Sequence, residues 1–342
     1  MAESNHTRYV SIGQETDYNT AVSEAAGHIG EVESESFQQS YDVMKRNDMN
    51  YIGSAKAVIG KKSAEGSFSM ALQPDAFTTM CLFGIMGAET GTIAAQGDER
   101  AFTQLQTGDA LPSYTFRIGR DDVESVFAGQ VFDSFNVSAS IGEYAMITFN
   151  TVGAGQGTDD TLHTAIPTYI GDAAHFTKAY VNFEGLATDS DFSSHVQSVD
   201  FEVKLNRELD STYSLGADTC ARPPQVQQVE ISGSLTFHKA MKSGDASANS
   251  DPYFATLMTG VDSIVDGSSS APAISALFKV DADDYIRFDF NKVVYEMAET
   301  SVSGRDAQTM SVNFHALYDI GSTGMMQIVI KGSDTSLLVN YD

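Results

Sequence analysis

The residue types that most often carry chemistry are present in this sequence, but their spacing specifies no known reaction. The segment DADD at 281–284 offers carboxylate oxygens of the kind that bind Ca²⁺. No glycine and closing glutamate follow it at the EF-hand spacing, so a solvated hairpin turn is favoured there. The segment DGSSS at 266–270 is typical of a flexible linker rather than of a nucleophile site. The histidines are scattered without metal-ligand spacing and are interpreted as solvated or structural: His6, His28, His163, His175, His195, His238 and His315.

The larger catalytic motifs are missing as well. The sequence contains no G-x-S-x-G elbow, phosphate-binding loop, dinucleotide fingerprint or H-E-x-x-H pair. A carboxylate pair for glycoside hydrolysis stays open, because 46 acidic residues offer many candidates and no sequence spacing specifies the separation needed. We therefore expect no enzyme, and no catalytic, cofactor-binding or metal-binding residues.

The two cysteines lie in different contexts. Cys81 lies in the apolar stretch TTMCLFGIMG and is expected to be buried, whereas Cys220 lies in the polar stretch GADTCARPP and is expected to be exposed. Contexts so unlike indicate neither a shared metal site nor a disulfide.

Charge is the outlying property of the composition. The chain of 342 residues carries 46 Asp and Glu against 20 Lys and Arg, a formal net charge of −26. The acidic residues are scattered rather than gathered in a tail, which favours adaptation to high salt, where screening is strong. The same charge argues against gripping a nucleic-acid backbone, which needs basic side chains. The N-terminus has no apolar signal core and no apolar run reaches 18 residues, so we expect folding in a cytoplasm and no membrane span.

Period-two alternation of apolar and polar residues predicts antiparallel strands through most of the chain, as in Tyr114, Phe116 and Ile118. The two halves also align with each other. Residues 32–70 fall on residues 199–237 at a constant offset of 167 without a gap, which places AEGSFSM on ISGSLTF. The alignment resumes at an offset of 162, where 114–122 falls on 276–284, and one residue of slip later MITFN meets TMSVN.

A short helix is expected in each half. In the first half, Pro74 lies near the first helical position and Gly87 follows the end, with one buried stripe of Phe77, Met80, Cys81 and Gly84. In the second half, Asp251 would cap a helix that begins at Pro252 and ends before Gly260, with Phe254, Leu257 and Met258 facing inward. Long polar loops are expected at 87–112, 150–167 and 259–273, the second being a glycine-rich joint.

These patterns predict a mainly β protein with two tandem antiparallel β-sandwich or barrel modules, each with a short helix. The expected boundaries are an N-terminal arm at 1–31, a first module at 32–153, a joint with a connecting strand at 154–198, a second module at 199–320 and a C-terminal strand or tail at 321–342. The arm is apolar enough that we expect it, with the 87–112 loop, to contact neighbouring subunits.

Several stretches, in this order along the chain, resemble the tail tube, or major tail, proteins of tailed viruses. They are RYVSIGQETDYNTAV, AEGSFSMALQPDAFTTMCLFGIMGA, SVDFEVKLNRELDSTYSLGAD and VQQVEISGSLTF. The resemblance implies β modules with a flanking helix whose sheets join around a ring, and rings that stack into a tube conducting the viral DNA without gripping it. It also implies a virion protein assembled in the host cytoplasm, with the tape measure, terminator and baseplate or tip proteins as partners.

Two modules per chain favour a homotrimeric ring with pseudo-sixfold symmetry over a hexamer of chains. The acidity departs from a typical member and leads us to expect a halophilic (haloarchaeal) host. Two other classes stay open at this point: a secreted or surface adhesive β-sandwich protein of a halophile and a β-rich hydrolase.

Overall fold

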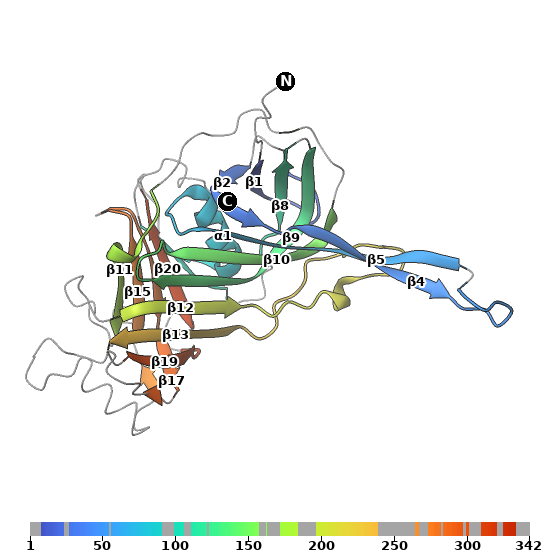
Figure 1. Cartoon of the computed structure of the whole chain (residues 1–342). Helices are drawn as coiled ribbons and strands as arrows, with labels where there is room; N and C mark the ends of the chain where they lie inside the picture. The colour runs from blue at the N-terminus through green and yellow to red at the C-terminus, as the bar shows by residue number, and fades with distance from the viewer. Residues whose placement is uncertain are drawn as a thin grey trace, which may run out of the picture.

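The chain folds into two antiparallel sheets and one α-helix in the computed structural model, as the alternation predicts (Figure 1). The structure describes residues 8–23, 27–54, 56–90, 99–105, 111–121, 123–156, 162, 172–183, 196–238, 264–266, 273–281, 283–296, 299–300, 309–319 and 324–332. The helix expected between Pro252 and Gly260 lies outside these residues.

The larger sheet has 14 strands and passes through both halves of the sequence. Its order is β14 (Ile264–Asp266), β17 (Lys292–Tyr295), β19 (Thr309–Ala316), β13 (Glu230–His238), β12 (Val196–Lys204), β9 (Val123–Ser140), β10 (Met146–Gln156), β5 (Lys56–Ala71) and β3 (Val32–Glu35). Branches from this order are β4 (Gln38–Arg46) on β5, β8 (Tyr114–Arg120) on β9, β1 (Arg8–Gln14) on β8, β2 (His28–Gly30) on β1, and β18 (Glu299–Thr300) on β19.

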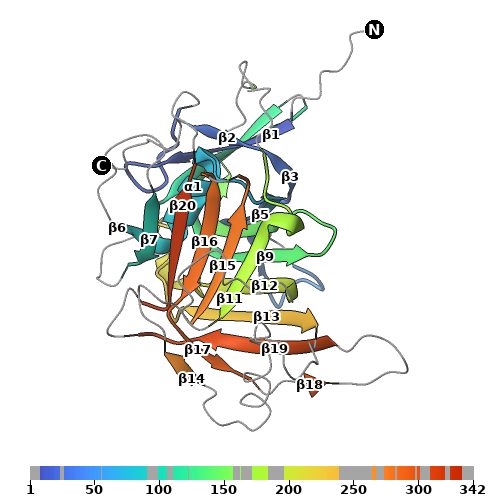
Figure 2. The same ribbon diagram turned by 90° about the vertical axis from the view of Figure 1, so that its left-hand side faces the viewer.

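The smaller sheet has six strands, which run across one face of the larger sheet (Figure 2). Its order is β11 (Ala179–Phe183), β15 (Ile274–Lys279), β16 (Tyr285–Phe290), β20 (Met326–Lys331), β7 (Arg100–Gln104) and β6 (Gly87–Thr90). Aromatic rings fill the space between the sheets: the Phe288 ring centroid lies 5.0 Å from that of Phe201 and 6.1 Å from that of Phe135. Burial of such rings is the main stabilising term for the sandwich.

Helix α1 (Ala76–Met86) covers the first half of the core. Its N-cap is Asp75, whose carboxylate accepts the Thr78 amide at 2.7 Å, so Pro74 precedes the cap instead of opening the helix. Gly87 ends the helix in the left-handed region at φ 77°. The expected single stripe is wrong, because all residues of the helix except Phe83 are buried. Desolvation raises the pKa of Asp75 to about 6.

Equivalent strands in the two halves pair in the same register. Val32 faces Met70 and Glu35 faces Phe68 across β3–β5, with a bulge between these pairs. Val196 faces Phe237 and Val199 faces Leu235 across β12–β13, with a bulge at the same place. The offset of 167 therefore holds for β5 and β13, but it is 164 for β3 and β12. The ungapped alignment is wrong by three residues, because the connection between β12 and β13 is that much longer.

Three further pairings repeat in the same way. Phe68 faces Phe149 across β5–β10, and Leu235 faces Val312 across β13–β19. Asn136 faces Thr148 across β9–β10, and Glu299 faces Ser311 across β18–β19. In the third repeated pairing, Ile12 faces Phe116 across β1–β8, and Ala179 faces Phe278 across β11–β15. Strands β1 and β11 lie before residues 32 and 199, where the two modules were expected to begin. We call the strands of 8–156 the first strand set and those of 179–331 the second.

The sets differ in the continuity of one strand, β9 in the first set and its equivalent in the second. In the first set, β9 runs unbroken for 18 residues, and its register with β10 shifts between Asn150 and Thr151. In the second set, the equivalent strand is interrupted at Asn291, so that β16 belongs to the smaller sheet and β17 to the larger. The expected loops at 87–112 and 150–167 are also partly strand: the first contains β6 and β7, and the second begins with the end of β10.

Candidate assembly surfaces

One face of the larger sheet carries small polar side chains over strands of both sets. Along β5, for example, Phe68 and Met70 are buried while Ser67 and Ser69 lie on the opposite, partly exposed face. We call this the open face. Its members on the central strands include Ser67, Ser69, Thr148, Asn150, Asn136, Ser138, Asp200, Glu202, Ser232, Ser234, Thr236, Ser311 and Asn313.

Many of these side chains bond to each other across neighbouring strands. Ser34 and Ser69 share a hydrogen bond of 2.8 Å, and the Asn150 amide donates to Ser134 at 2.8 Å. In the second set, Thr236 and Ser311 lie 3.0 Å apart. These bonds occupy part of the donor capacity of the face, and such cross-strand pairs also stabilise the sheet.

The charged groups of the open face are mainly acidic. Glu65 and Asp200 are exposed, and the ammonium group of Lys204 lies 2.7 Å from the carboxylate of Glu202. A surface of hydroxyl, amide and carboxylate groups offers few cations to a phosphate backbone, and phosphate binding depends on such cations.

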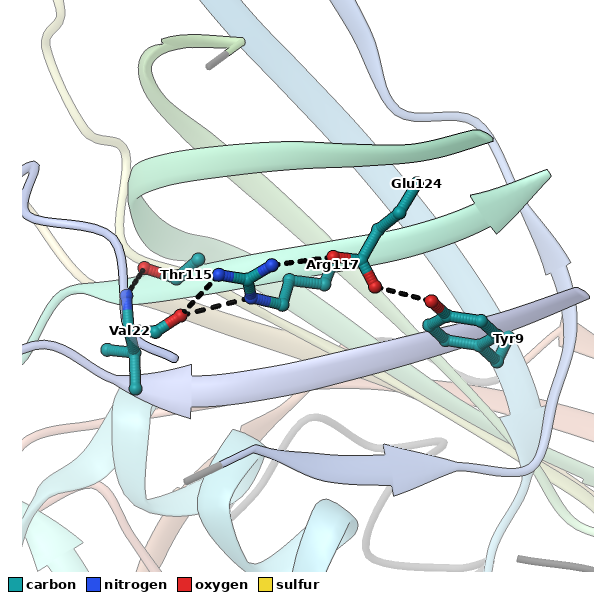
Figure 3. A network of polar contacts seen from close by, with 5 residues as sticks. All are labelled: Tyr9, Val22, Thr115, Arg117 and Glu124. Carbon is teal, nitrogen blue, oxygen red and sulfur yellow. Dashed lines mark hydrogen bonds and ion pairs between the residues drawn. The ribbon is translucent and has the colours of Figure 1, made fainter. Parts of the chain in front are cut away.

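The N-terminal strand is fastened to the first set by a buried polar network (Figure 3). Glu124, which is fully buried, accepts hydrogen bonds from the Tyr9 hydroxyl and, at 2.6 Å, from Arg117. Arg117 also donates to the Val22 carbonyl at 3.0 and 2.8 Å, and the Val22 amide donates to Thr115 at 3.1 Å. Losing one member of such a pair would leave the other as an uncompensated buried charge.

A second buried carboxylate, Glu15, fastens the same segment. It accepts hydrogen bonds from Ser113 at 2.7 Å, Thr115 at 2.8 Å and the Gly129 amide at 2.8 Å. The apolar side chains of the N-terminal arm, such as Ile12, are buried within the same chain. The hydrophobicity of the N-terminal arm is thus explained within one chain and no longer argues for contact with a neighbouring subunit.

The connection between β12 and β13, residues 205–229, folds back onto the first set. Arg207 donates to the Phe132 carbonyl at 2.6 Å and to the Pro224 carbonyl at 2.5 Å, and its amide donates to Asp133 at 2.8 Å. Desolvation lowers the pKa of Arg207 to about 10. Further along, Lys62 of β5 lies 2.6 Å from Asp218. We call residues 205–229 the connector.

Among the described residues, those considered for chemistry in the sequence are not brought together, whereas His6, His163, His195 and residues 267–270 lie outside the described part of the chain. Asp281 accepts the amides of Asp283 and Asp284 at 2.7 and 2.8 Å, which is a turn between β15 and β16. Within the described residues, no three His, Cys, Asp or Glu side chains form a metal-binding group. Cys81 is buried as expected, but the expected exposure of Cys220 is wrong, because the connector is packed down and buries it.

No helix among the described residues is long and apolar enough to cross a membrane. The observed surfaces are a polar sheet face, strand edges at the two ends of a continuous sheet, and loops fixed by ion pairs. Together with the fold they define a mainly β protein of two antiparallel sheets, whose polar sheet face and strand edges are its candidate contact surfaces.

The sequence comparison agrees with this class. The family model for phage tail tube proteins matches residues 6–240, more than half of the chain, and the chain belongs to this family. It is a structural protein of the virion tail. A search among curated proteins finds no match.

Proposed function

We propose that this chain forms closed rings that stack into the tail tube, and that viral DNA passes through the lumen to the host without specific binding. The observation that carries the proposal is the continuous 14-stranded sheet. Within it, β12 of the second set pairs with β9 of the first, from Ser198 opposite Ser140 to Lys204 opposite Ser134.

This junction supplies a template for contact between chains. In the first set, β3 and β4 occupy the place that β12 has in the second, and among the described residues they pair only with β5. In the second set, β17 and β18 occupy the place of β9. Pairing the β3–β4 edge of one chain with the β18 edge of the next repeats the β12–β9 junction head to tail. Such a contact, repeated around a closed ring, pairs both edges that a sheet otherwise leaves open.

The junction also favours three chains per ring. The two sets lie side by side in one sheet, which is the arrangement expected of neighbours around a ring. Two homologous modules per chain would then give a trimer with pseudo-sixfold symmetry. The alternative is a hexamer of chains with the modules stacked along the axis.

We further propose that the open face lines the lumen. Its short hydroxyl and amide side chains are partly bonded to one another, and its charge is mainly acidic. A phosphate backbone is repelled by such a surface, so DNA can slide past it. The partners in this function are further copies of the chain, the tape measure, the terminator, and baseplate or tip proteins. Assembly is expected in the host cytoplasm.

We propose a haloarchaeal host, and the acidity of the chain supports a host that lives at high salt. Copies with a formal charge of −26 repel each other on assembly, and salt screens this repulsion. We expect assembled tubes to dissociate in dilute buffer.

A cross-linking experiment tests the ring directly. Equivalent registers place Gln38 of one chain opposite Glu299 of the next, as Glu202 lies opposite Asn136 within a chain. The double variant Q38C/E299C should give closed, covalently linked trimers at high salt, and E202C/N136C, its matched control, should cross-link only within a chain. Electron microscopy and the mass of isolated rings count the copies. Covalent hexamers would show the trimer to be wrong, and monomers without rings or tubes at any salt concentration would overturn the proposed function.

A further inference from the structure

Two buried polar atoms beneath the connector have no hydrogen-bond partner among the described residues. One is the hydroxyl of Tyr18, in the segment that follows β1, and the other is Nη2 of Arg207, at the start of the connector. Leaving such an atom unpaired costs free energy, and native proteins satisfy nearly all of them with protein atoms or ordered water. Two unpaired atoms in one region therefore point to a bound molecule.

The segments that carry these atoms meet over one corner of the first strand set. A Cβ placed on Gly129 of β9 would lie 3.2 Å from the side chain of Asn19, the residue after Tyr18. A Cβ placed on Gly155 of β10, which pairs with β9 at this point, would lie 3.8 Å from Thr219 of the connector. The N-terminal segment and the connector thus pack on neighbouring positions of the same two strands.

The guanidinium group of Arg207 is held in place by its other nitrogen atoms. Its Nε donates to the Phe132 carbonyl at 2.6 Å and its Nη1 donates to the Pro224 carbonyl at 2.5 Å, so Nη2 cannot turn outward without breaking both bonds. Burial lowers the pKa of Arg207, and Asp133 and Tyr18 act in the opposite direction, which places Tyr18 close to the guanidinium group.

The thiol of Cys220 is the third polar group at this place. Burial raises the pKa of the Tyr18 hydroxyl, and the adjacent Cys220 acts in the same direction. Cys220 is itself buried, and a thiol is only a weak donor and acceptor. We call Tyr18, Arg207 and Cys220 the connector triad. It offers strong donors from Arg207 and a hydroxyl that can donate or accept.

The charges around the triad favour a neutral ligand over an anion. The carboxylate of Asp133 accepts the Arg207 amide at 2.8 Å and offsets the charge of the guanidinium group. The carboxylate of Glu15 lies near Tyr18 and adds a second negative charge. A bound anion would increase this buried negative charge and would also lose its own hydration. A water molecule avoids both costs, and buried water commonly makes about three hydrogen bonds to such groups.

We propose that the connector triad binds one ordered water molecule, which accepts a hydrogen bond from Nη2 of Arg207 and bonds to the hydroxyl of Tyr18. This water joins the N-terminal segment to the connector and so helps to hold the connector on the first strand set.

A double-mutant cycle tests the bridge in the full-length chain. Tyr18→Phe removes only the hydroxyl, and it should lower the folding equilibrium constant about fivefold in a denaturant titration, because the water loses a partner. In the Arg207→Met background the same change should have little further effect, since the water has already lost its main donor. The control Tyr9→Phe removes a buried hydroxyl bonded to Glu124, and its effect should be the same in both backgrounds. Unchanged or increased stability of Tyr18→Phe, or an equal loss in both backgrounds, would overturn the inference.

Two further measurements identify the bound molecule. A structure at a resolution that shows ordered water should contain density within hydrogen-bonding distance of both Arg207 Nη2 and the Tyr18 hydroxyl, and direct contact between the two side chains would overturn the inference. Thermal melts of wild type and Tyr18→Phe in chloride and in gluconate at equal ionic strength test for an anion. The difference in Tm between the two proteins should be the same in both salts. A difference that appears only in chloride would assign the site to an anion and would show the water to be wrong.

Discussion

The two strand sets use the same ladder registers but finish them differently, and the differences lie where the sets meet the outside. In the first set, β4 and β5 form a projecting two-stranded arm, residues 41–54 and 56–59, which we call the β4–β5 arm (Figure 1). In the second set, the folded connector joins β12 to β13. Arg207 holds the connector against the first set of its own chain. Among the described residues, no strand outside the hairpin covers the β4–β5 arm in this way. The segment that follows β12 therefore packs on its own chain, whereas the segment between β4 and β5 projects from it.

The largest effect is expected from removing the projecting β4–β5 arm. Replacing residues 42–61 with Asn-Gly closes β4 and β5 by a two-residue turn between Tyr41 and Lys62, which face each other. The exposed apolar side chains of the β4–β5 arm are removed by this change, so assembly should be weakened, while the Tm should stay within about 2 °C because the arm buries little apolar surface. Electron microscopy and a thermal melt measure the two outcomes. A large fall in Tm would mean that the β4–β5 arm stabilises the folded body, and it would contradict the contrast between a projecting arm and a packed connector.

Detaching the connector should cost stability instead. Arg207→Met keeps the length of the side chain but removes the donors to the Phe132 and Pro224 carbonyls. We expect a loss of about 2 kcal/mol in the free energy of unfolding, since hydrogen bonds from charged groups exceed neutral ones while removal of a desolvated cation offsets part of the cost. Denaturant titration measures it. Arg222→Met, which loses one bond of 3.0 Å at an exposed site, is the control and should change little.

A smaller effect tests whether the sets are packed alike. Gly66 and Gly233 are equivalent, and a Cβ added to either would lie 2.2 Å from the Phe37 ring or 2.5 Å from the Phe314 ring. Phe37 is enclosed by Phe116 and Phe127, with ring centroids at 4.9 and 5.4 Å. Gly66→Ala should therefore destabilise by about 1–3 kcal/mol. Gly233→Ala should lower the free energy of unfolding by a similar amount in the same titration. A loss at one position with no change at the other would show that the two sets are packed differently.

The smallest effect concerns the ion pair under the connector. The hydrogen bond and charge of Lys62 lower the pKa of Asp218 below its ordinary value of 3.8. A lowered pKa stabilises the fold above 3.8 and loses that contribution as the pH falls through the folded value. Lys62→Ala should thus reduce the Tm slightly at pH 7 and low salt. The difference from wild type should vanish in strong acid and at high salt, and one that persists in both would point to packing rather than charge.

The strands and the first helix could be predicted because their signals are local. Alternation along Tyr114–Ile118 depends only on neighbouring residues, as do the proline before helix α1 and the glycine after it, although the N-cap itself, Asp75, was not predicted. The three-residue correction could not be predicted, because the added residues lie in the connector, where no periodic pattern fixes the register. The burial of Cys220 and the β6–β7 pair arise from contacts with distant segments. The open face could not be predicted for the same reason. A serine is expected to face solvent in any strand, and only the pairing of distant strands shows that these serines share one face of the sheet.

The position of β20 has a consequence for the order in which the protein can be completed during synthesis. This strand, at Met326–Lys331, lies between β16 and β7 in the smaller sheet, and Ile328 faces Phe102 across more than 200 residues of chain. Until β20 has left the ribosome, β7 and β16 lack their shared neighbour and the apolar face around Phe102 lacks its cover. A pairing this remote in sequence forms late and slowly. A chain that ends before Met326 would expose two unpaired strand edges, on β7 and on β16, and such edges attract chaperones, proteases and other copies of the chain.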